Sequence, residues 1–272
     1  MINYVIYGHT DYLDILKIQT DYTQNRGHLT LFINENNLDI NELYEKYDEV
    51  VYYNDKETYA LRVLSCLEKI NYDYILFIHD IDIILDSDVN IIKKLFEFLK
   101  INNFDRVDLK YSDKINPSTN LIKINNLRDV SQWEQVSVNE IDKKTNTHYL
   151  IEQDDVTNYI YNVNPSIWKR ESFIELLSNF KHKNYRTIEE IDVQIYSKKF
   201  KIFKMFSNKK LDCGYFQCLD SFVFLHISHN GKLLPLNMDF VTVYGQSYND
   251  ISSQYIKIVE KYNLINSNKW YK

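Results

Sequence analysis

The feature that most constrains the fold is an apolar run from Tyr74 to His79 that ends on two aspartates, Asp80 and Asp82. A short, continuous apolar run is typical of a strand that is buried on both faces of an α/β sheet. Ligands of such sheets gather beyond the carboxyl ends of the strands. The run therefore predicts a central strand with two carboxylates at its ligand-binding edge.

Strand-like and helix-like patterns alternate through the first hundred residues. The strand patterns cover 2–7, 28–33 and 49–53, and the helix patterns cover 10–24, 41–47 and 56–70, ahead of the strand that ends at His79. This rhythm predicts a parallel sheet. Right-handed crossovers would place the loops after Tyr7, Ile33, Tyr53 and His79 along one edge, where we expect the nucleotide cleft.

The pattern becomes mixed in the second half of the chain. A helix is expected over 88–100, with Asp86, Ser87 or Asp88 as its N-cap. The later expectations are strands at 105–111, 118–125, 147–162, 200–206 and 222–227, a polar insertion at 139–146, helices at 167–180 and 187–199, and an amphipathic helix over 251–262. We predict an α/β fold in which helices flank a mixed sheet. One compact unit would hold a nucleotide-sugar-binding half (1–104), an acceptor half (105–235) and a C-terminal helical extension (236–272).

Composition excludes some classes of protein. A net charge of −6 argues against a nucleic-acid binder. No apolar run approaches the roughly 18 residues that a transmembrane helix needs. The start of the chain lacks the pattern of a signal peptide, the three cysteines lack zinc spacing, and no Asn-x-Ser/Thr acceptor occurs. These features favour a protein of the cytoplasm.

The spacing of Asp80 and Asp82 suits a divalent cation. Two hard oxygen ligands can hold such a cation and leave coordination positions for phosphate oxygens. The alternative is a polar turn that closes a core strand. A second Asp-x-Asp, Asp86 to Asp88, is interpreted as structural because it precedes a helix.

Three residues are candidates for contact with a nucleotide. Tyr7 and Thr10 flank Gly8 at the end of the first strand, where a tight turn could present N–H groups and the Thr10 hydroxyl. Thr10 could equally be a helix N-cap. Arg62, in the helix before the Asp-x-Asp strand, could face the nucleotide or be solvated.

A late segment contains His226 and His229, followed by an Asn-Gly turn and Lys232. A histidine here could supply a third metal ligand, and His229 is favoured because it lies nearer the turn. Lys232 could neutralise a diphosphate. The alternative is a surface hairpin with solvated histidines.

A general base would be a carboxylate that accepts the proton of an attacking hydroxyl. The candidates are the acidic residues at the start of the helix expected over 187–199 and a pair earlier in the chain, namely Glu189, Glu190, Asp192, Asp154 and Asp155. Thr187 and Glu190 also fit a capping box, which would need no catalytic role.

Together these features resemble the GT-A glycosyltransferases, in particular the small domains found in large DNA viruses and some bacteria. The likeness rests on the Asp80-Ile81-Asp82 strand end, Arg106 to Leu109, Asn164 to Arg170, the acidic segment at Glu189 and the late His before Gly-Lys. It implies that Asp80, Asp82 and His229 position Mn²⁺ or Mg²⁺ on a donor diphosphate, and that Glu189 is the base.

We therefore expect a metal-dependent glycosyltransferase that moves a sugar from a nucleotide-sugar donor to a glycan or other hydroxyl acceptor. One alternative is a nucleotidyltransferase with paired aspartates and Mg²⁺. Another is a catalytically inactive carbohydrate-binding or scaffold protein of the same fold.

Overall fold

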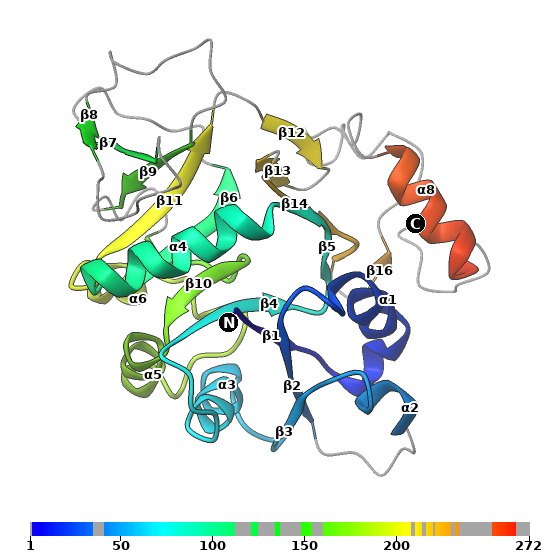
Figure 1. Ribbon diagram of the computed structural model, residues 1–272. Coiled ribbons are helices and arrows are strands. Elements are labelled where there is room, and N and C mark those ends of the chain that lie inside the picture. Colours follow the sequence, from blue (N-terminus) through cyan, green and yellow to red (C-terminus); the bar gives the residue numbers. More distant parts are fainter. Residues whose placement is uncertain are drawn as a thin grey trace.

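The computed structural model describes residues 2–34, 41–111, 121–124, 134–136, 148–153, 160–207, 210–213, 216–219, 221–229, 232–233 and 252–264. Within them, the strands form sheets of ten, four and two strands (Figure 1). The large sheet has the order β3-β2-β1-β4-β10-β6-β11-β9-β7-β8. The predicted α/β class, with helices flanking a mixed sheet, is confirmed. In this part of the chain no helix is long and apolar enough to cross a membrane.

The first four strands are parallel, as the alternating pattern predicts. They are β1 (Asn3–Tyr7), β2 (His28–Asn34), β3 (Glu49–Tyr53) and β4 (Tyr74–His79), and the connections contain η1 (Thr10–Tyr12), α1 (Leu13–Thr23), α2 (Asn41–Tyr44) and α3 (Tyr59–Leu67). The chain moves outward from β1 to β3 and then returns to place β4 on the other side of β1. Parallel sheets bind ligands where the strand order reverses in this way. Here that point lies between the carboxyl ends of β1 and β4.

The second half of the chain extends the sheet beyond β4. Strand β10 (Ser166–Lys169) is antiparallel to both β4 and β6 (Arg106–Tyr111), and β11 (Ile202–Ser207) is parallel to β6. The outer strands are β9 (His148–Glu152), β7 (Leu121–Ile124) and β8 (Glu134–Val136). Helix α4 (Val89–Asn102) precedes β6 in the chain, and α5 (Arg170–Asn179) and α6 (Ile191–Ser197) lie between β10 and β11.

The helix predicted over 167–180 begins later, because its first residues form β10. Ile167 and Trp168 are both fully buried, one in each of the two hydrophobic clusters on opposite faces of the sheet. Pairing with two neighbouring strands overrides the local helical spacing. Since β10 is antiparallel to β4, its first residue lies near the carboxyl end of β4.

A second correction concerns the residues after the Asp-x-Asp motif. We expected no strand between Asp82 and the next helix, yet β5 (Asp82–Ser87) pairs with β14 (Phe222–His226) in the four-stranded sheet, beside β13 (Phe216–Leu219) and β12 (Lys210–Cys213). Asp88 is the N-cap of α4, as proposed, and its carboxylate accepts from the N–H groups of Asn90 and Ile91. The two-stranded sheet contains β15 (Ser228–His229) and β16 (Lys232–Leu233).

The two faces of the large sheet bury different clusters. The cluster on one face contains residues of α1, α4 and the four-stranded sheet, and it continues into α8 (Ser252–Lys261). The other face packs against α3, α5 and α6, and α3 and α5 lie side by side there (Figure 1). Residues alternate between the faces, so Ile6 and Ile78 belong to the first cluster, and Val5 and Phe77 to the second.

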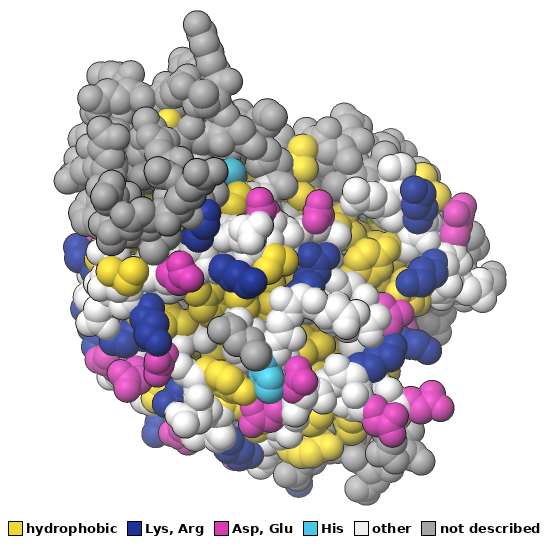
Figure 2. All heavy atoms as spheres, viewed as in Figure 1, with side chains coloured by type: hydrophobic (Ala, Val, Ile, Leu, Met, Phe, Trp, Pro, Cys, Tyr) yellow, Lys and Arg dark blue, Asp and Glu magenta, His cyan; other side chains and the backbone are white. Residues whose placement is uncertain are grey.

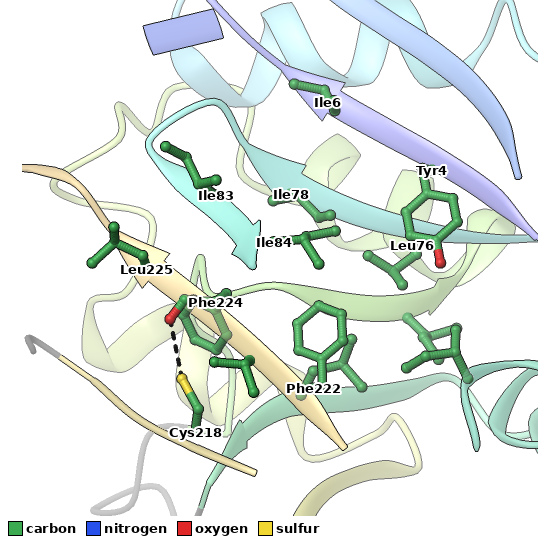
Figure 3. Close-up of a cluster of buried hydrophobic side chains, with 14 of the residues drawn as sticks. Tyr4, Ile6, Leu76, Ile78, Ile83, Ile84, Cys218, Phe222, Phe224 and Leu225 are labelled. Carbon is green, nitrogen blue, oxygen red and sulfur yellow. Dashed lines mark hydrogen bonds between the residues drawn. The ribbon is translucent and has the colours of Figure 1, made fainter. Parts of the chain in front are cut away.

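The four-stranded sheet is joined to the large one by a continuous apolar cluster. Figure 3 shows Ile83 and Ile84 of β5 beside Ile78 of β4, with Phe224 and Leu225 of β14 close by. The thiol of Cys218 donates to the carbonyl oxygen of Phe224 at 3.1 Å. This packing holds β14 firmly against the strand that leads to Asp80.

Candidate active site

Asp80 lies at the point where the strand order reverses. Its N–H donates to the carbonyl oxygen of Tyr7 at 2.9 Å, and its Oδ2 accepts from the N–H of His9 at 3.2 Å. A Cβ on Gly8 would lie 3.4 Å from that Oδ2 and 3.1 Å from Cδ1 of Leu16. Glycine at this position lets the end of β1 approach the carboxylate closely.

Burial of Asp80 favours its neutral, protonated form. The residue is only 6% exposed. Burial raises the pKa of Asp80 to about 7, although the N–H of His9 lowers the pKa; the nearby charge of Asp82 raises it further. A divalent cation beside the two carboxylates would favour their ionised forms.

Asp82 is held by one contact to its side chain and one to its backbone. Its Oδ1 lies 2.7 Å from Nδ1 of His226, the residue opposite it in the β5–β14 ladder. Its carbonyl oxygen accepts from Nε2 of Gln19 at 3.0 Å, and Oε1 of the same Gln19 accepts from the N–H of Ile84 at 3.2 Å. The side chain is therefore oriented before any ligand binds.

A cluster of aromatic rings lies beside the carboxylates. The ring of His79 stacks on Tyr59, and its Nε2 lies 3.0 Å from the Tyr59 hydroxyl. Burial lowers the pKa of His79 to about 4, so the ring is neutral at pH 7. Tyr185 meets both rings edge-on, with centroids 5.4 Å from each, and remains 42% exposed.

Glu189 belongs to the same region of the molecule. Burial raises the pKa of Tyr185, and the charges of Asp82, Glu189 and Asp80 raise it further. The Tyr185 hydroxyl therefore interacts electrostatically with all three carboxylates. Oε1 of Glu189 accepts from the N–H of Val163 at 2.7 Å. Burial also raises the pKa of Glu189, which makes its carboxylate a stronger base.

The neighbouring acidic residues have other partners. Nζ of Lys183 lies 2.5 Å from Glu190 and 2.9 Å from Asp192. The capping box of Thr187 and Glu190 does not form, because α6 begins at Ile191 with Glu190 itself as its N-cap. Asp154 and Asp155, the other base candidates, lie outside the described residues.

The candidate nucleotide contacts lie along the ends of the first three strands. The ring of Tyr7 stacks on that of Tyr53, with 5.2 Å between centroids. Thr10 is not a helix N-cap, because the side chain of His9 accepts from the N–H of Asp11 in that role. Instead, Oγ1 of Thr10 accepts from Nδ2 of Asn34 at 2.8 Å.

Arg62 joins this edge through Asp55, a residue that the sequence patterns did not single out. The guanidinium lies 2.8 Å from Asp55 and 5.7 Å from the centre of the Tyr53 ring. The other carboxylate oxygen of Asp55 lies 3.1 Å from Nε2 of His9. The signal that could have identified Asp55 is its position, two residues beyond the end of the third strand.

His229 and Lys232 are placed only by their backbones, which pair with each other in β15 and β16. Their side chains are outside the described part of the structure. His229 lies three residues beyond His226, the histidine that contacts Asp82.

The described side chains give a candidate metal site two carboxylate donors, those of Asp80 and Asp82. Among the side chains that the structure describes, no three from His, Cys, Asp and Glu form a metal-binding group. Asp80 and Asp82 are both buried, at 6% and 3% exposure. Two carboxylates fit an ion such as Mg²⁺, which commonly binds through one or two carboxylates and is completed by substrate phosphates and water.

The charges on the surface are mixed. On the face shown in Figure 2, basic and acidic side chains are interspersed, and neither sign gathers into one continuous patch. Among the side chains described on that face, there is no broad basic track of the kind that nucleic-acid backbones require.

No model of a known protein family matches the chain, and no curated protein sequence matches it. Among solved structures, residues 1–349 of S. aureus TarS align with a TM-score of 0.41 and 14% identity, covering 76% of this chain and 60% of that one. The same TarS fragment has been solved with UDP-GlcNAc. The chain thus spans about 60% of the TarS fragment's length.

Two nucleotide-handling enzymes align over longer stretches. UDP-glucose pyrophosphorylase complexed with UDP-glucose gives a TM-score of 0.45 and 11% identity, covering 94% of this chain and 99% of that one. A cytidylyltransferase from Leptospira borgpetersenii gives 0.42 and 12%, covering 100% and 98%. Values this low assign no reaction to the chain, so its function has to be argued from the site.

Proposed function

We propose that the protein is a metal-dependent glycosyltransferase that moves a sugar from a nucleotide-sugar donor to a hydroxyl acceptor. Residues 1–104 would bind the donor, and residues 105–235 would form the acceptor side. The observation that carries the proposal is the pair of buried carboxylates, Asp80 and Asp82, at the point where the strand order reverses. Such a point is where open α/β sheets bind ligands.

The donor would lie across the ends of β1, β2 and β3. Tyr7, Thr10 and Arg62 lie along this edge, and the ring of Tyr7 stacks on the buried ring of Tyr53. Lys232 is our candidate for neutralising the diphosphate. Asp80 and Asp82, with His229 as a third ligand, would hold Mn²⁺ or Mg²⁺, which when bound offsets the charge of the leaving diphosphate.

Glu189 is the proposed general base. Its carboxylate would take the proton of the acceptor hydroxyl while that oxygen bonds to the anomeric carbon and the carbon–oxygen bond to the diphosphate breaks. The hydrogen bond from Val163 occupies Oε1, so the proton would be accepted at Oε2. The ion pairs of Lys183 with Glu190 and Asp192 favour Glu189 over those two neighbours.

The test is a thermal-shift screen of UDP, GDP, CMP and dTDP sugars and of nucleoside triphosphates, each with and without Mn²⁺. A ligand that binds only the folded protein raises its melting temperature. We expect a metal-dependent shift with one nucleotide sugar, and slow hydrolysis of that sugar. Asp82→Ala should abolish the shift, whereas Asp86→Ala, which removes an exposed carboxylate of the same strand, should retain it.

Three results would overturn the proposal. Nucleoside triphosphates that bind and react in place of nucleotide sugars would identify a nucleotidyltransferase. Carbohydrate binding without any hydrolysis would identify an inactive binding protein. An unchanged metal-dependent shift of the melting temperature in Asp82→Ala would show that the Asp-x-Asp motif does not bind the ligand.

A further inference from the structure

Three buried polar residues, Arg106, Asp108 and Asn162, form a hydrogen-bonded cluster near Glu189. Arg106 and Asp108 are two residues apart on β6, so their side chains point to the same face of the sheet, and both are 0% exposed. They are bridged by the amide of Asn162. Its Oδ1 accepts from Arg106 at 2.7 Å, and its Nδ2 donates to Oδ2 of Asp108 at 2.6 Å.

The guanidinium of Arg106 also donates hydrogen bonds to the backbone around Asn162. It donates to the carbonyl oxygens of Ile160 at 3.2 Å and of Asn162 at 2.9 Å, and it lies 4.9 Å from the centre of the Trp168 ring. Loss of these acceptors would leave N–H groups of the buried guanidinium without hydrogen bonds, which would lower the stability of the folded protein. The segment 160–164 is therefore held in one conformation by β6.

This segment in turn holds Glu189. The N–H of Val163 donates to Oε1 of Glu189 at 2.7 Å. One residue earlier than Asn162, the N–H of Tyr161 donates to Oε1 of Gln194 at 2.9 Å, and Nε2 of the same Gln194 donates to the carbonyl oxygen of Glu189 at 2.9 Å. Both the side chain and the backbone of Glu189 are thus fixed relative to segment 160–164.

We propose that Arg106, Asn162 and Asp108 are positioning residues, which fix segment 160–164 so that the N–H of Val163 orients the carboxylate of Glu189. The inference rests on the proposed function in taking Glu189 as the base. None of the three residues needs to touch a substrate. Their contribution would be to hold the base in one geometry, and a misplacement of about 1 Å can cost about 10²-fold in rate.

The charges around Glu189 are consistent with this role. Burial raises the pKa of Glu189, the N–H of Val163 and the charges of Arg106 and Lys110 lower it, and Asp108 raises it. Tyr59, Tyr161 and Tyr185 are the other titratable groups whose charges couple to Glu189. Displacing Val163 would remove a contribution that favours the ionised carboxylate.

The experiment measures the pKa of Glu189 directly, by NMR of the full-length protein carrying carbon-13-labelled glutamate, with Glu189→Gln to assign the resonance. In Asn162→Ala the bridge is lost without a new charge, and we expect the pKa of Glu189 to rise. Ser166→Ala is the comparison variant, because Ser166 contacts the same guanidinium at 3.2 Å and the carbonyl oxygen of Asn164 at 2.9 Å but does not join Arg106 to Asp108. Its Glu189 should titrate as in the wild type.

A donor–acceptor exchange provides the second arm. Asn162→Asp alone places two carboxylates together and should disturb both the fold and Glu189. Adding Asp108→Asn restores an amide–carboxylate pair with the roles exchanged, and should return the melting temperature and the pKa of Glu189 toward the wild-type values. If Asn162→Ala fails to fold, the comparison of Asn162→Asp with the double variant decides whether these residues position Glu189.

The proposal is overturned if Asn162→Ala lowers the melting temperature but leaves the pKa of Glu189 unchanged, or if the double variant does not restore that pKa or does not fold. The NMR titration requires no substrate. If the wild-type protein turns over no nucleotide sugar, the proposed function is wrong. The titration would still decide whether Arg106, Asn162 and Asp108 position Glu189.

Discussion

Asp82 and His226 lie directly opposite each other in the β5–β14 ladder, and Nδ1 of His226 is 2.7 Å from Oδ1 of Asp82. Both residues are buried, at 3% and 6% exposure. The contact joins β5 to β14 at the end of their ladder, two residues after Asp80, and orients a candidate metal ligand. Outer hydrogen bonds of this kind position the ligands of metal sites.

His226→Ala should therefore affect both stability and metal binding. Loss of a hydrogen bond to a charged group should lower the free energy of unfolding by about 1.5–3 kcal/mol. Mn²⁺ affinity should fall by about 10–100-fold. Urea denaturation in EDTA and a Mn²⁺ titration followed by electron paramagnetic resonance measure the two effects. His229→Ala is the comparison: a direct ligand would weaken Mn²⁺ binding with little change in the stability of the metal-free protein.

Asp80→Asn should stabilise the metal-free protein. Burial holds the pKa of Asp80 at about 7 in the folded state, against about 3.9 in an unfolded chain. Between those values the folded state binds a proton that the unfolded state does not. The free energy of unfolding should therefore fall as pH rises through that interval, by up to about 1.4 kcal/mol per pH unit.

This slope should be flatter in Asp80→Asn, measured by urea denaturation in EDTA across the same pH range. The variant should be the more stable protein at pH 7 and should no longer bind Mn²⁺ with the donor. Parallel stability–pH curves for the two proteins would contradict the buried titration of Asp80.

Glu189→Gln should separate binding from turnover. The amide oxygen can still accept from Val163, so the local structure should persist, but the base is lost. We expect kcat to fall by about 10²–10⁴-fold, with the KM for the donor little changed. Glu190→Gln is the matched control, since that carboxylate is paired with Lys183. Inactivation by Glu190→Gln alone would show that the base is assigned to the wrong residue.

Arg62→Ala should weaken donor binding. The side chain is held by Asp55 beside the Tyr53 ring, at the edge where we place the nucleotide. Loss of one charge-assisted contact should raise the Kd of the nucleoside diphosphate by about tenfold or more, measured by calorimetry. Lys69→Ala removes another cation that follows α3, one bonded to the carbonyl oxygen of Tyr52. Equal losses in both variants would indicate general attraction rather than a specific contact.

The sequence alone was sufficient for the four parallel strands, β1 to β4. The apolar run of β4 and the alternating patterns before it are local signals, because a strand buried on both faces must be apolar throughout. The topology rules for parallel strands then place the ends of β1 and β4 together. The position of Asp80 follows from these two steps. The sequence also narrowed the N-cap of α4 to Asp86, Ser87 or Asp88, and the structure places it at Asp88.

Tertiary structure decided what depends on distant partners. Residues 166–169 carry a helical spacing but form β10, because β4 and β6 supply pairing on both sides. Asp82 and His226 are 144 positions apart in the chain. Only the register of the β5–β14 ladder places His226 opposite Asp82, and likewise only the packing of segment 160–164 against β6 connects Asn162 with Glu189. Periodicity and spacing record the local environment of a residue, whereas these contacts arise from how strands far apart in sequence pair and pack.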